Sequence, residues 1–516
     1  MKSWLKNAVF YEIYPQSFND TNGDGIGDLN GIIQKLDYIR DMGFTAIWMN
    51  PCYASPFTDA GYDVEDYYRI APRYGTNEDL KRLCDEAHAR GIRVMLDLVP
   101  GHTAYTCRWF QESMKPEKNP YSGRYVWTDS AWESMDGIGG VRGVVRGISQ
   151  RNGCCAVNYY STQPALNYGF ARITAPWQHP VDSPEATATR EELLRIIRFW
   201  LGLGCDGFRV DMAGSLVKND DDQAETIRLW QNLFAQVRKD FPEAAFVSEW
   251  GEPDKALLAG YDMDFLLHFG PSHYNDLFRE ENRYFAADGK GDLREFFRLY
   301  MENLQLTEGK GLICLPSGNH DMTRIAHHLD ADRLKLAYAF LLSMPGVPFI
   351  YYGDEIGMRY LEGITSVEGG YERTGARSPM QWDRGVNCGF STASPEDLYI
   401  PIDPSPDRPT VADQLPDESS LLNTLKGLIA LRKATPALQE SAAFRPVCVE
   451  GYPLVYLRDD GERTVLVAIN PADRAASCPF EGQLGDLLYQ YGGAVTAQNG
   501  ALTVPPCSAS YVTVTE

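Results

Sequence analysis

Residues 93–100 read RVMLDLVP, a short apolar run that reads as a β-strand and stops at a proline. Seven similar runs occur along the chain, and longer stretches with helical periodicity separate them. They cover residues 8–15, 44–51, 207–212, 245–250, 265–270, 311–321 and 348–357. Eight strands that alternate with helices predict an α/β fold, a parallel (β/α)8 or TIM barrel.

Two breaks in this alternation divide the chain into domains. Residues 102–167 are rich in Gly, Trp, Tyr and Ser and contain far more chain than one helix needs, which predicts a small inserted domain after the third strand. Beyond Pro436 the pattern changes to strands with a hairpin at Asp460-Gly461, which predicts a C-terminal β-sandwich. The predicted domains are the barrel (1–101 and 168–436), the insertion (102–167) and the sandwich (437–516).

Composition and charge argue against several kinds of partner. The 516 residues carry a formal net charge of −22, which repels polyanions, so neither nucleic acid nor an anionic membrane is an expected partner. The N-terminal residues lack an apolar core of signal-peptide length, and no segment approaches a membrane span. Eleven cysteines without a CxxC pair are expected to be reduced thiols. A soluble, cytoplasmic protein is predicted.

Polar residues gather at the carboxyl ends of four predicted strands, where a barrel of this kind holds its active site. The strand ends read DLVPGH (97–102), GFRVD (207–211), SEW (248–250) and GNHD (318–321). A single aspartate at a strand end is at least as often a helix cap as a catalyst. Four such ends in one chain predict a functional site.

A second polar cluster, DTNGDGIGDL at residues 20–29, lies between the first strand and a run of apolar residues at helical spacing. Its aspartates, asparagine and glycines allow a tight loop to turn several side-chain oxygens onto one hard cation. The loop is not an EF-hand, because Gly31 stands where that loop carries a bidentate glutamate. The alternative is a solvated turn.

Together these motifs resemble glycoside hydrolase family 13, the α-amylase superfamily, over the whole chain. DLVPGH, GFRVD, SEW and GNHD stand in the order of the family's signature regions, with GFTAIWMNP (43–51) on the second strand. The members that the chain resembles most are oligo-1,6-glucosidases, α-glucosidases and trehalose synthase-like enzymes. The resemblance implies the same barrel, with the insertion as domain B and the sandwich as domain C.

The resemblance implies three catalytic carboxylates: Asp211 as nucleophile, Glu249 as general acid/base and Asp321 as the group that grips sugar hydroxyls. A retaining glycosidase needs two carboxyls roughly 5 Å apart, one ionised and one protonated. Arg209 shares a strand face with Asp211 and can keep it ionised. Trp250 and nearby acids surround Glu249, which favours a raised pKa.

Further matches concern the substrate. His102 and His320 resemble the family's sugar-binding histidines. In the oligosaccharide-cleaving members that the chain resembles, the residues matching Asp59 and Arg377 pair to close the pocket behind one terminal glucose, and the residue matching Tyr62 stacks on its ring. A closed pocket implies exo-action, so an endo-acting α-amylase is less expected.

The same subgroup carries a DxNxDGxGD loop that holds a structural calcium ion. This implies a Ca²⁺ remote from the chemistry, and its implied ligands are the side chains of Asp20, Asn22, Asp24 and Asp28 and the carbonyl of Ile26.

The expected activity is that of a retaining, exo-acting α-glucosidase that hydrolyses short α-glucosides, its oligosaccharide partners, through a covalent glucosyl-enzyme. The alternative is a transferase or isomerase similar to trehalose synthases and sucrose isomerases, in which a sugar replaces water. An inactive, transporter-associated homologue is less expected. Such proteins lose catalytic carboxylates and carry a membrane span, whereas this sequence keeps all three carboxylates and has no predicted span. Ala165 and Met212 depart from the subgroup's usual residues, so linkage stays open, as does the oligomeric state.

Overall fold

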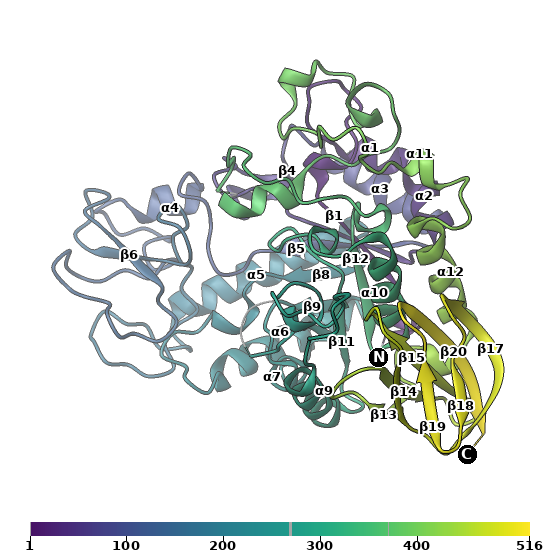
Figure 1. Cartoon of the computed structure of the whole chain (residues 1–516). Coiled ribbons are helices and arrows are strands. Elements are labelled where there is room, and N and C mark those ends of the chain that lie inside the picture. Colours follow the sequence, from purple (N-terminus) through teal and green to yellow (C-terminus); the bar gives the residue numbers. More distant parts are fainter. Residues whose placement is uncertain (1, 268–270, 370, 516) are drawn as a thin grey trace.

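The computed structural model describes residues 2–267, 271–369 and 371–515 (Figure 1). Its centre is a closed barrel of parallel strands in the order β1-β12-β11-β10-β9-β8-β5-β2, and two antiparallel sheets lie near the C-terminus. The predicted barrel with C-terminal sheets is therefore confirmed. The barrel strands are β1 (Phe10–Ile13), β2 (Ala46–Met49), β5 (Arg93–Leu98), β8 (Gly207–Val210), β9 (Ala245–Ser248), β10 (Met263–Phe265), β11 (Leu312–Pro316) and β12 (Val347–Tyr351).

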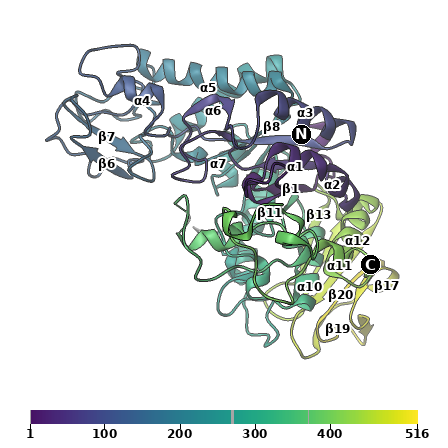
Figure 2. The same ribbon diagram turned by 90° about the horizontal axis from the view of Figure 1, so that it is seen from above.

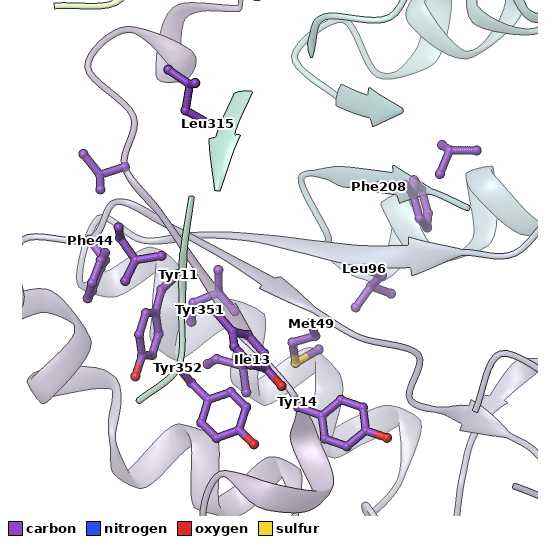
Figure 3. Close-up of a cluster of buried hydrophobic side chains, with 14 of the residues drawn as sticks. Tyr11, Ile13, Tyr14, Phe44, Met49, Leu96, Phe208, Leu315, Tyr351 and Tyr352 are labelled. Carbon is purple, nitrogen blue, oxygen red and sulfur yellow. The ribbon is translucent and has the colours of Figure 1, made fainter. Parts of the chain in front are cut away.

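Side chains alternate along the barrel strands between the interior and the layer of helices outside. Phe10 belongs to the cluster that fills the barrel, whereas its neighbour Tyr11 faces outwards and stacks on Phe44 at 4.5 Å between ring centroids. Figure 3 shows this outer layer, with Tyr11 and Phe44 on the helix side of the strands. Because residues two apart share a face, Arg209 and Asp211 both project inwards at the carboxyl end of β8.

Helices cover the barrel, and local capping sets where several of them begin. α3 begins at a capping box in which Thr76 and Asp79 satisfy each other's backbone N–H groups. The side chains of Ser183 and Asp330 cap the N-termini of α5 and α10. The helices around the barrel are α1 (Leu29–Gln34), α2 (Leu36–Met42), α3 (Asn77–Ala89), α5 (Pro184–Leu203), α6 (Ala224–Asp240), α7 (Pro253–Leu258), α8 (Asn275–Phe278), α9 (Arg294–Thr307), α10 (Ala331–Ser343), α11 (Val411–Gln414) and α12 (Leu421–Ala434).

One strand lies at a different position in the structure from the one predicted. The sequence places the sixth strand at residues 265–270, but β10 is Met263–Phe265, and residues 268–270 lie outside the described residues. The strand begins early because Met263 pairs with Val247 of β9, and the N–H of Asp262 already bonds the carbonyl of Phe246. This register matters for the site, since it places Asp264 beside Ser248.

The insertion extends from one side of the barrel, and the C-terminal sheets lie on another (Figure 2). Backbone bridges join His102 to Ala165 and Tyr125 to Leu166, so the two ends of the insertion lie together. Its small core also contains Phe170, beyond the predicted end at residue 167. The elements of this region are α4 (Arg108–Ser113), β6 (Gly143–Arg146) and β7 (Cys154–Val157), and the hairpin β3 (Tyr53–Ala54) and β4 (Asp66–Ile70) follows β2.

The C-terminal part contains a five-stranded and a three-stranded antiparallel sheet, and one apolar core includes Leu466 of the first and Leu502 of the second. The predicted hairpin at Asp460-Gly461 is present, because β14 ends at residue 459 and β15 begins at residue 464. The strands are β13 (Ala443–Cys448), β14 (Leu454–Asp459), β15 (Thr464–Asn470), β16 (Ala476–Pro479), β17 (Gln483–Tyr491), β18 (Thr496–Gln498), β19 (Ala501–Val504) and β20 (Ser508–Thr515).

Two further features bear on the predictions. All eleven cysteines are free thiols. Among residues 2–267, 271–369 and 371–515, no helix has both the length and the apolar character needed to cross a membrane.

Candidate active site

A cavity of about 380 Å³ lies at the carboxyl ends of the barrel strands and contains all three predicted catalytic carboxylates. Asp211 directly follows β8, Glu249 follows β9, and Asp321 lies in the loop after β11. Domain B contributes Tyr159 and Gln163 to the wall. The predicted site residues on the lining are Asp59, Tyr62, His102, Asp211, Glu249 and Asp321.

One buried arginine joins Asp211 and Glu249. Nη1 of Arg209 lies 3.0 Å from Oδ1 of Asp211 and 2.9 Å from Oδ1 of Asp97, and Nη2 lies 2.9 Å from Oε2 of Glu249. Arg209 is 2% exposed, so water screens these ion pairs little. The arginine that the sequence predicts beside Asp211 therefore contacts Glu249 as well.

Asp211 and Glu249 have different ionisation behaviour. Burial raises the pKa of Asp211 to about 6, although Arg209 opposes the shift. Burial raises the pKa of Glu249 to about 7, again against Arg209, with the charges of Asp211 and Asp321 adding to the rise. Near neutral pH Asp211 is therefore mostly ionised, while a large fraction of Glu249 stays protonated, which suits the roles predicted for them.

The turn after Asp211 holds the side chain of Glu249. Met212 has φ 45°, in the left-handed region that is uncommon for a residue with a side chain. In this conformation its N–H donates to Oε2 of Glu249 at 3.0 Å. Arg209 also holds Oε2.

Asp321 is held as an anion. Its Oδ1 lies 2.7 Å from Nη1 of Arg373 and 3.1 Å from Nη2 of Arg377, and its Oδ2 lies 3.3 Å from Nε2 of His320. Burial raises the pKa of Asp321, but these three cationic neighbours outweigh burial and hold the pKa well below its usual range. An ionised carboxylate in the cavity accepts hydrogen bonds from sugar hydroxyls.

The two predicted histidines differ in charge. Burial lowers the pKa of His102 to about 4, so the ring is neutral, and its Nε2 lies 2.9 Å from the carbonyl of Tyr62. Burial also lowers the pKa of His320, but Asp321 and Glu12 overcome it and raise the pKa to about 9. Nδ1 of His320 lies 2.9 Å from Glu12. His102 lines the cavity, while His320 supports Asp321 as a cation.

The structure corrects the ion pair predicted at the closed end of the pocket. Nη2 of Arg377 lies 3.1 Å from Asp321, its Nε donates to the carbonyl of His320 at 2.9 Å, and its Nη1 donates to the hydroxyl of Tyr14 at 3.5 Å. Arg373, four residues earlier on the 3-10 helix Tyr371–Arg377, lies 3.3 Å from Asp59 instead. Nε2 of Gln163 donates to the other oxygen of Asp59 at 2.6 Å.

Tyr62, predicted to stack on the sugar, lines the cavity with its hydroxyl bonded to Asp97 at 2.9 Å. Its ring is nearly parallel to that of His320, with 5.1 Å between centroids. Sugar stacking on this ring stays a prediction.

Sequence reasoning did not assign roles to Glu12, Asn50 or Arg373. Glu12 is wholly buried, and its Oε1 accepts from Asn50 at 3.2 Å and contacts His320. A signal was present for Glu12: it is a charged residue inside the apolar run AVFYEIYP, on the inward face by the two-residue alternation. Arg373 had no such signal, because it lies on the short 3-10 helix Tyr371–Arg377, outside any periodic apolar pattern.

The loop at residues 20–28 lies outside the cavity lining. Asp20 accepts hydrogen bonds from the N–H groups of Asn22, Gly23 and Gly25, and the side chain of Asp28 caps α1. Its all-oxygen donors suit calcium in kind, but among the described residues no group of three or more His, Cys, Asp or Glu side chains is arranged to hold a metal ion. Calcium binding stays a prediction.

The helix predicted after this loop is divided in the structure. Lys35, with φ −101° and ψ 3°, separates α1 from α2, because its backbone leaves the helical region.

Comparison with known proteins agrees with this geometry. The family model for the α-amylase catalytic domain matches residues 12–441. The chain belongs to the α-amylase family. It is accordingly a glycoside hydrolase, an enzyme that acts on O-glycosyl bonds.

Relatives within the family differ in activity. The chain is 32% identical to the trehalose synthase/amylase TreS of Mycobacterium tuberculosis, over 90% of this chain and 82% of the relative. It is 31% identical to an oligo-1,6-glucosidase of Heyndrickxia coagulans, over 92% and 94% of the two chains. The trehalulose synthase MutB from Pseudomonas mesoacidophila MX-45 superimposes over 100% of both chains with a TM-score of 0.83 at 27% identity. MutB structures include complexes with sucrose, glucose and isomaltulose.

Proposed function

We propose that this enzyme is a retaining, exo-acting α-glucosidase that hydrolyses short α-glucosides. The observation that carries the proposal is that Asp211, Glu249 and Asp321 line one cavity, and that an ion pair between Asp59 and Arg373 lies at one end of it. The first two residues supply the chemistry, and the ion pair limits the length of chain that can enter.

The residues support a two-step mechanism with a covalent intermediate. Arg209 holds Oδ1 of Asp211, so Oδ2 is the oxygen that attacks the anomeric carbon. Glu249 donates its proton to the leaving oxygen as that bond breaks, and a glucosyl ester of Asp211 forms. Glu249, now ionised, removes a proton from water, which attacks the same carbon and restores Asp211. Asp321 binds sugar hydroxyls throughout.

Exo-action follows from the contacts of Arg373. Its guanidinium contacts Asp321 and Asp59, and it donates to the hydroxyl of Tyr160 from domain B at 3.2 Å. These contacts join the barrel loop to domain B behind the place of one glucosyl ring. A terminal glucose fits in front of this closure, and the middle of a long chain does not.

The second candidate function is glucosyl transfer to a sugar, favoured by the similarity to TreS and MutB. Transfer uses the same glucosyl-enzyme and differs only in the molecule that attacks it. Whether water or sugar attacks depends on the part of the cavity beside Glu249.

The two candidates are separated by product analysis over time. The enzyme is incubated with maltose, isomaltose, trehalose, sucrose or starch, and the products are resolved by chromatography. We expect glucose from disaccharides as the first product and little release from starch. Early new disaccharides would establish transfer instead, and release of long oligomers from starch would contradict exo-action.

We also propose a cytoplasmic location, supported by eleven unbridged cysteines, which fit a reducing compartment. Cell fractionation with activity measurement tests it, and activity in the culture medium of intact cells would contradict it.

A further inference from the structure

Asp264, on β10, is a wholly buried carboxylate on the far side of the barrel wall from the cavity. Its neighbours Met263 and Phe265 belong to the core that fills the barrel, so the alternation along the strand turns Asp264 outwards, towards the helices. Burial raises the pKa of its carboxyl to about 7, and in the described part of the chain it forms no ion pair. A carboxylate buried in this way is costly unless hydrogen bonds compensate for the lost water.

The hydrogen bonds of Asp264 go to the segment that carries Glu249. Its Oδ1 accepts from Oγ of Ser248 at 2.7 Å and from the backbone N–H of Trp250 at 3.2 Å. These two residues stand directly before and after Glu249 in the chain. One buried carboxylate oxygen therefore holds the backbone on both sides of the general acid.

The pairing of β9 with β10 ends at this point, where Asp264 lies opposite Ser248. On the other side of β9, the N–H of Glu249 donates to the carbonyl of Val210 in β8 at 2.9 Å. On the β10 side, the carboxylate of Asp264 takes the N–H of Trp250 in place of a strand carbonyl. The short segment with Glu249 is thus tied to both neighbouring strands, to one of them by a side chain.

The side chain of Trp250 has supports of its own. A Cβ added at Gly214 would lie 2.5 Å from Nε1 of the indole, so the glycine leaves room for this ring. The Nε1–H of the indole donates to Oε1 of Gln223 at 3.2 Å. Loss of the Asp264 carboxylate should therefore release the backbone at Glu249 and leave the indole seated.

We propose that Asp264 is a positioning residue for the general acid. It acts through the backbone of Ser248 and Trp250, which aims the carboxyl of Glu249 at the leaving oxygen. Proton transfer requires the acid within hydrogen-bond reach of that oxygen, so a displaced backbone weakens the transfer and leaves the pocket for glucose intact. The inference rests on the proposed function, because it assigns Asp264 to the acid step of that mechanism.

The test compares two substrates that differ in their need for an acid. The leaving oxygen of a disaccharide needs the proton of Glu249, whereas fluoride leaves α-glucosyl fluoride without one. Measured as loss of substrate, kcat/KM reports the steps up to the glucosyl-enzyme, whether water or a sugar then takes the glucose. In Asp264→Ala, kcat/KM for the best disaccharide should fall about 30-fold, part of the roughly 10²- to 10⁴-fold that a general acid contributes, and kcat/KM for the fluoride should stay within about twofold.

Two milder variants sharpen the test. Asp264→Asn keeps an oxygen in the place of Oδ1 and should retain most of the disaccharide activity. Ser248→Ala removes one of the two donors and leaves Asp264 in place. It should lower kcat/KM about threefold, as expected for one hydrogen bond, and for the disaccharide alone.

The matched control is Glu355→Ala. Glu355 is also wholly buried in the outer layer, where its Oε1 accepts from the hydroxyls of Tyr11 at 2.6 Å and Tyr38 at 2.8 Å. Its loss should lower the Tm, because two buried hydroxyls lose their acceptor. Any effect on kcat/KM should be the same for the disaccharide and the fluoride.

Three results would overturn the inference. Equal losses on both substrates in Asp264→Ala would mean that the carboxylate only supports the fold, and parental disaccharide kinetics would mean that Glu249 keeps its place without it. A loss in Asp264→Asn as large as in Asp264→Ala would contradict the hydrogen-bonding role. If Asp264→Ala does not fold, the same comparison in Ser248→Ala decides. A parent enzyme that consumes neither substrate would instead refute the proposed function.

Discussion

The cavity has a glucosyl half, lined by Asp59, Gln163, Asp321 and Arg373, and an acceptor half, lined by Gly214, Gln223 and Trp250, and different kinds of interaction build the two. In the glucosyl half, partly buried charges hold one another: Arg373 lies between Asp59 and Asp321, and Gln163 supports Asp59. In the acceptor half, an indole lies on a glycine and its only polar atom is bonded to an amide oxygen. The first half is therefore held by charge and the second by packing.

This difference predicts how each half responds to substitution. A buried ion pair that loses one member leaves an unpaired charge, which is costly. An indole that is removed leaves no unpaired charge, and only its packing contacts are lost. Damage should therefore be largest at the chemistry between the halves, large in the glucosyl half, and modest in the acceptor half.

The largest effect is expected at the residues between the halves. Asp211→Ala removes the covalent acceptor, and Glu249→Gln removes the proton donor, so each should lower kcat for disaccharides by at least about 10³-fold. Circular dichroism should show an unchanged fold. Azide should partly restore turnover in Asp211→Ala and give the product of inverted configuration. Parental rates in either variant would contradict the assigned mechanism.

Within the glucosyl half, Arg373→Met should leave Asp59 and Asp321 without their shared partner. We expect kcat/KM for disaccharides to fall by a factor that corresponds to at most about 3 to 5 kcal/mol, the range for a fully buried pair, because the Arg373 side chain is 26% exposed. Longer maltodextrins should lose less. The matched control is Arg384→Met. Arg384 lies on the same segment as Arg373, between β12 and α11, but it is exposed and pairs with Asp413. Equal kinetics in Arg373→Met and the parent would show that this pair does not close the pocket.

The pH dependence should report both catalytic carboxyls. Activity rises with pH as Asp211 ionises, with an apparent pKa near 6, and falls as Glu249 loses its proton, near 7. Because the two groups interact, the fitted values belong to the pair. Disaccharide kcat/KM should therefore follow a narrow bell with about tenfold loss per pH unit on each side. With α-glucosyl fluoride, which needs no proton, the alkaline fall of kcat/KM should vanish, and its persistence would argue against Glu249 as the acid.

The smallest effect on activity is expected from the loop at residues 20–28, which belongs to neither half. We propose that it binds one structural Ca²⁺, on the strength of its oxygen donors and its resemblance to calcium loops. An ion that binds only the folded state adds roughly 2.7 kcal/mol at a hundredfold excess over its Kd. Chelation should lower the Tm, and calcium should restore it, in the parent but not in Asp24→Ala.

Initial rates well below the Tm should survive the same chelation, since no step of the mechanism uses a metal. A Tm that is indifferent to chelator would refute the calcium assignment. An immediate, calcium-reversible loss of activity in folded protein would refute the structural role.

Much of the barrel could be predicted from the sequence, because strands and helices follow local periodicity. The exceptions show where local pattern fails. The apolar run at 265–270 extends past β10, since pairing with β9 and not hydrophobicity sets where that strand lies. The helix after residue 29 is broken at Lys35 although its apolar spacing continues.

The site divides in the same way. Asp211, Glu249 and Asp321 were predictable because each stands at a strand end within a short motif, and the barrel brings strand ends together. The ion pair that Asp59 forms at the closed end of the pocket was not predictable. Arg373 and Arg377 are four residues apart on one short 3-10 helix, and only the packing around them decides which guanidinium reaches Asp59.

The sequence alone thus determined the barrel, the family resemblance and the positions of the catalytic carboxyls, because these depend on residue type and spacing along the chain. Only the tertiary structure decided the ionisation states, the partner of Asp59 and the seat of Trp250 on Gly214. These depend on burial and on contacts between segments far apart in sequence. Local periodicity does not predict such contacts. Many side chains have the chemistry to form them, and the packing of the fold decides which ones do.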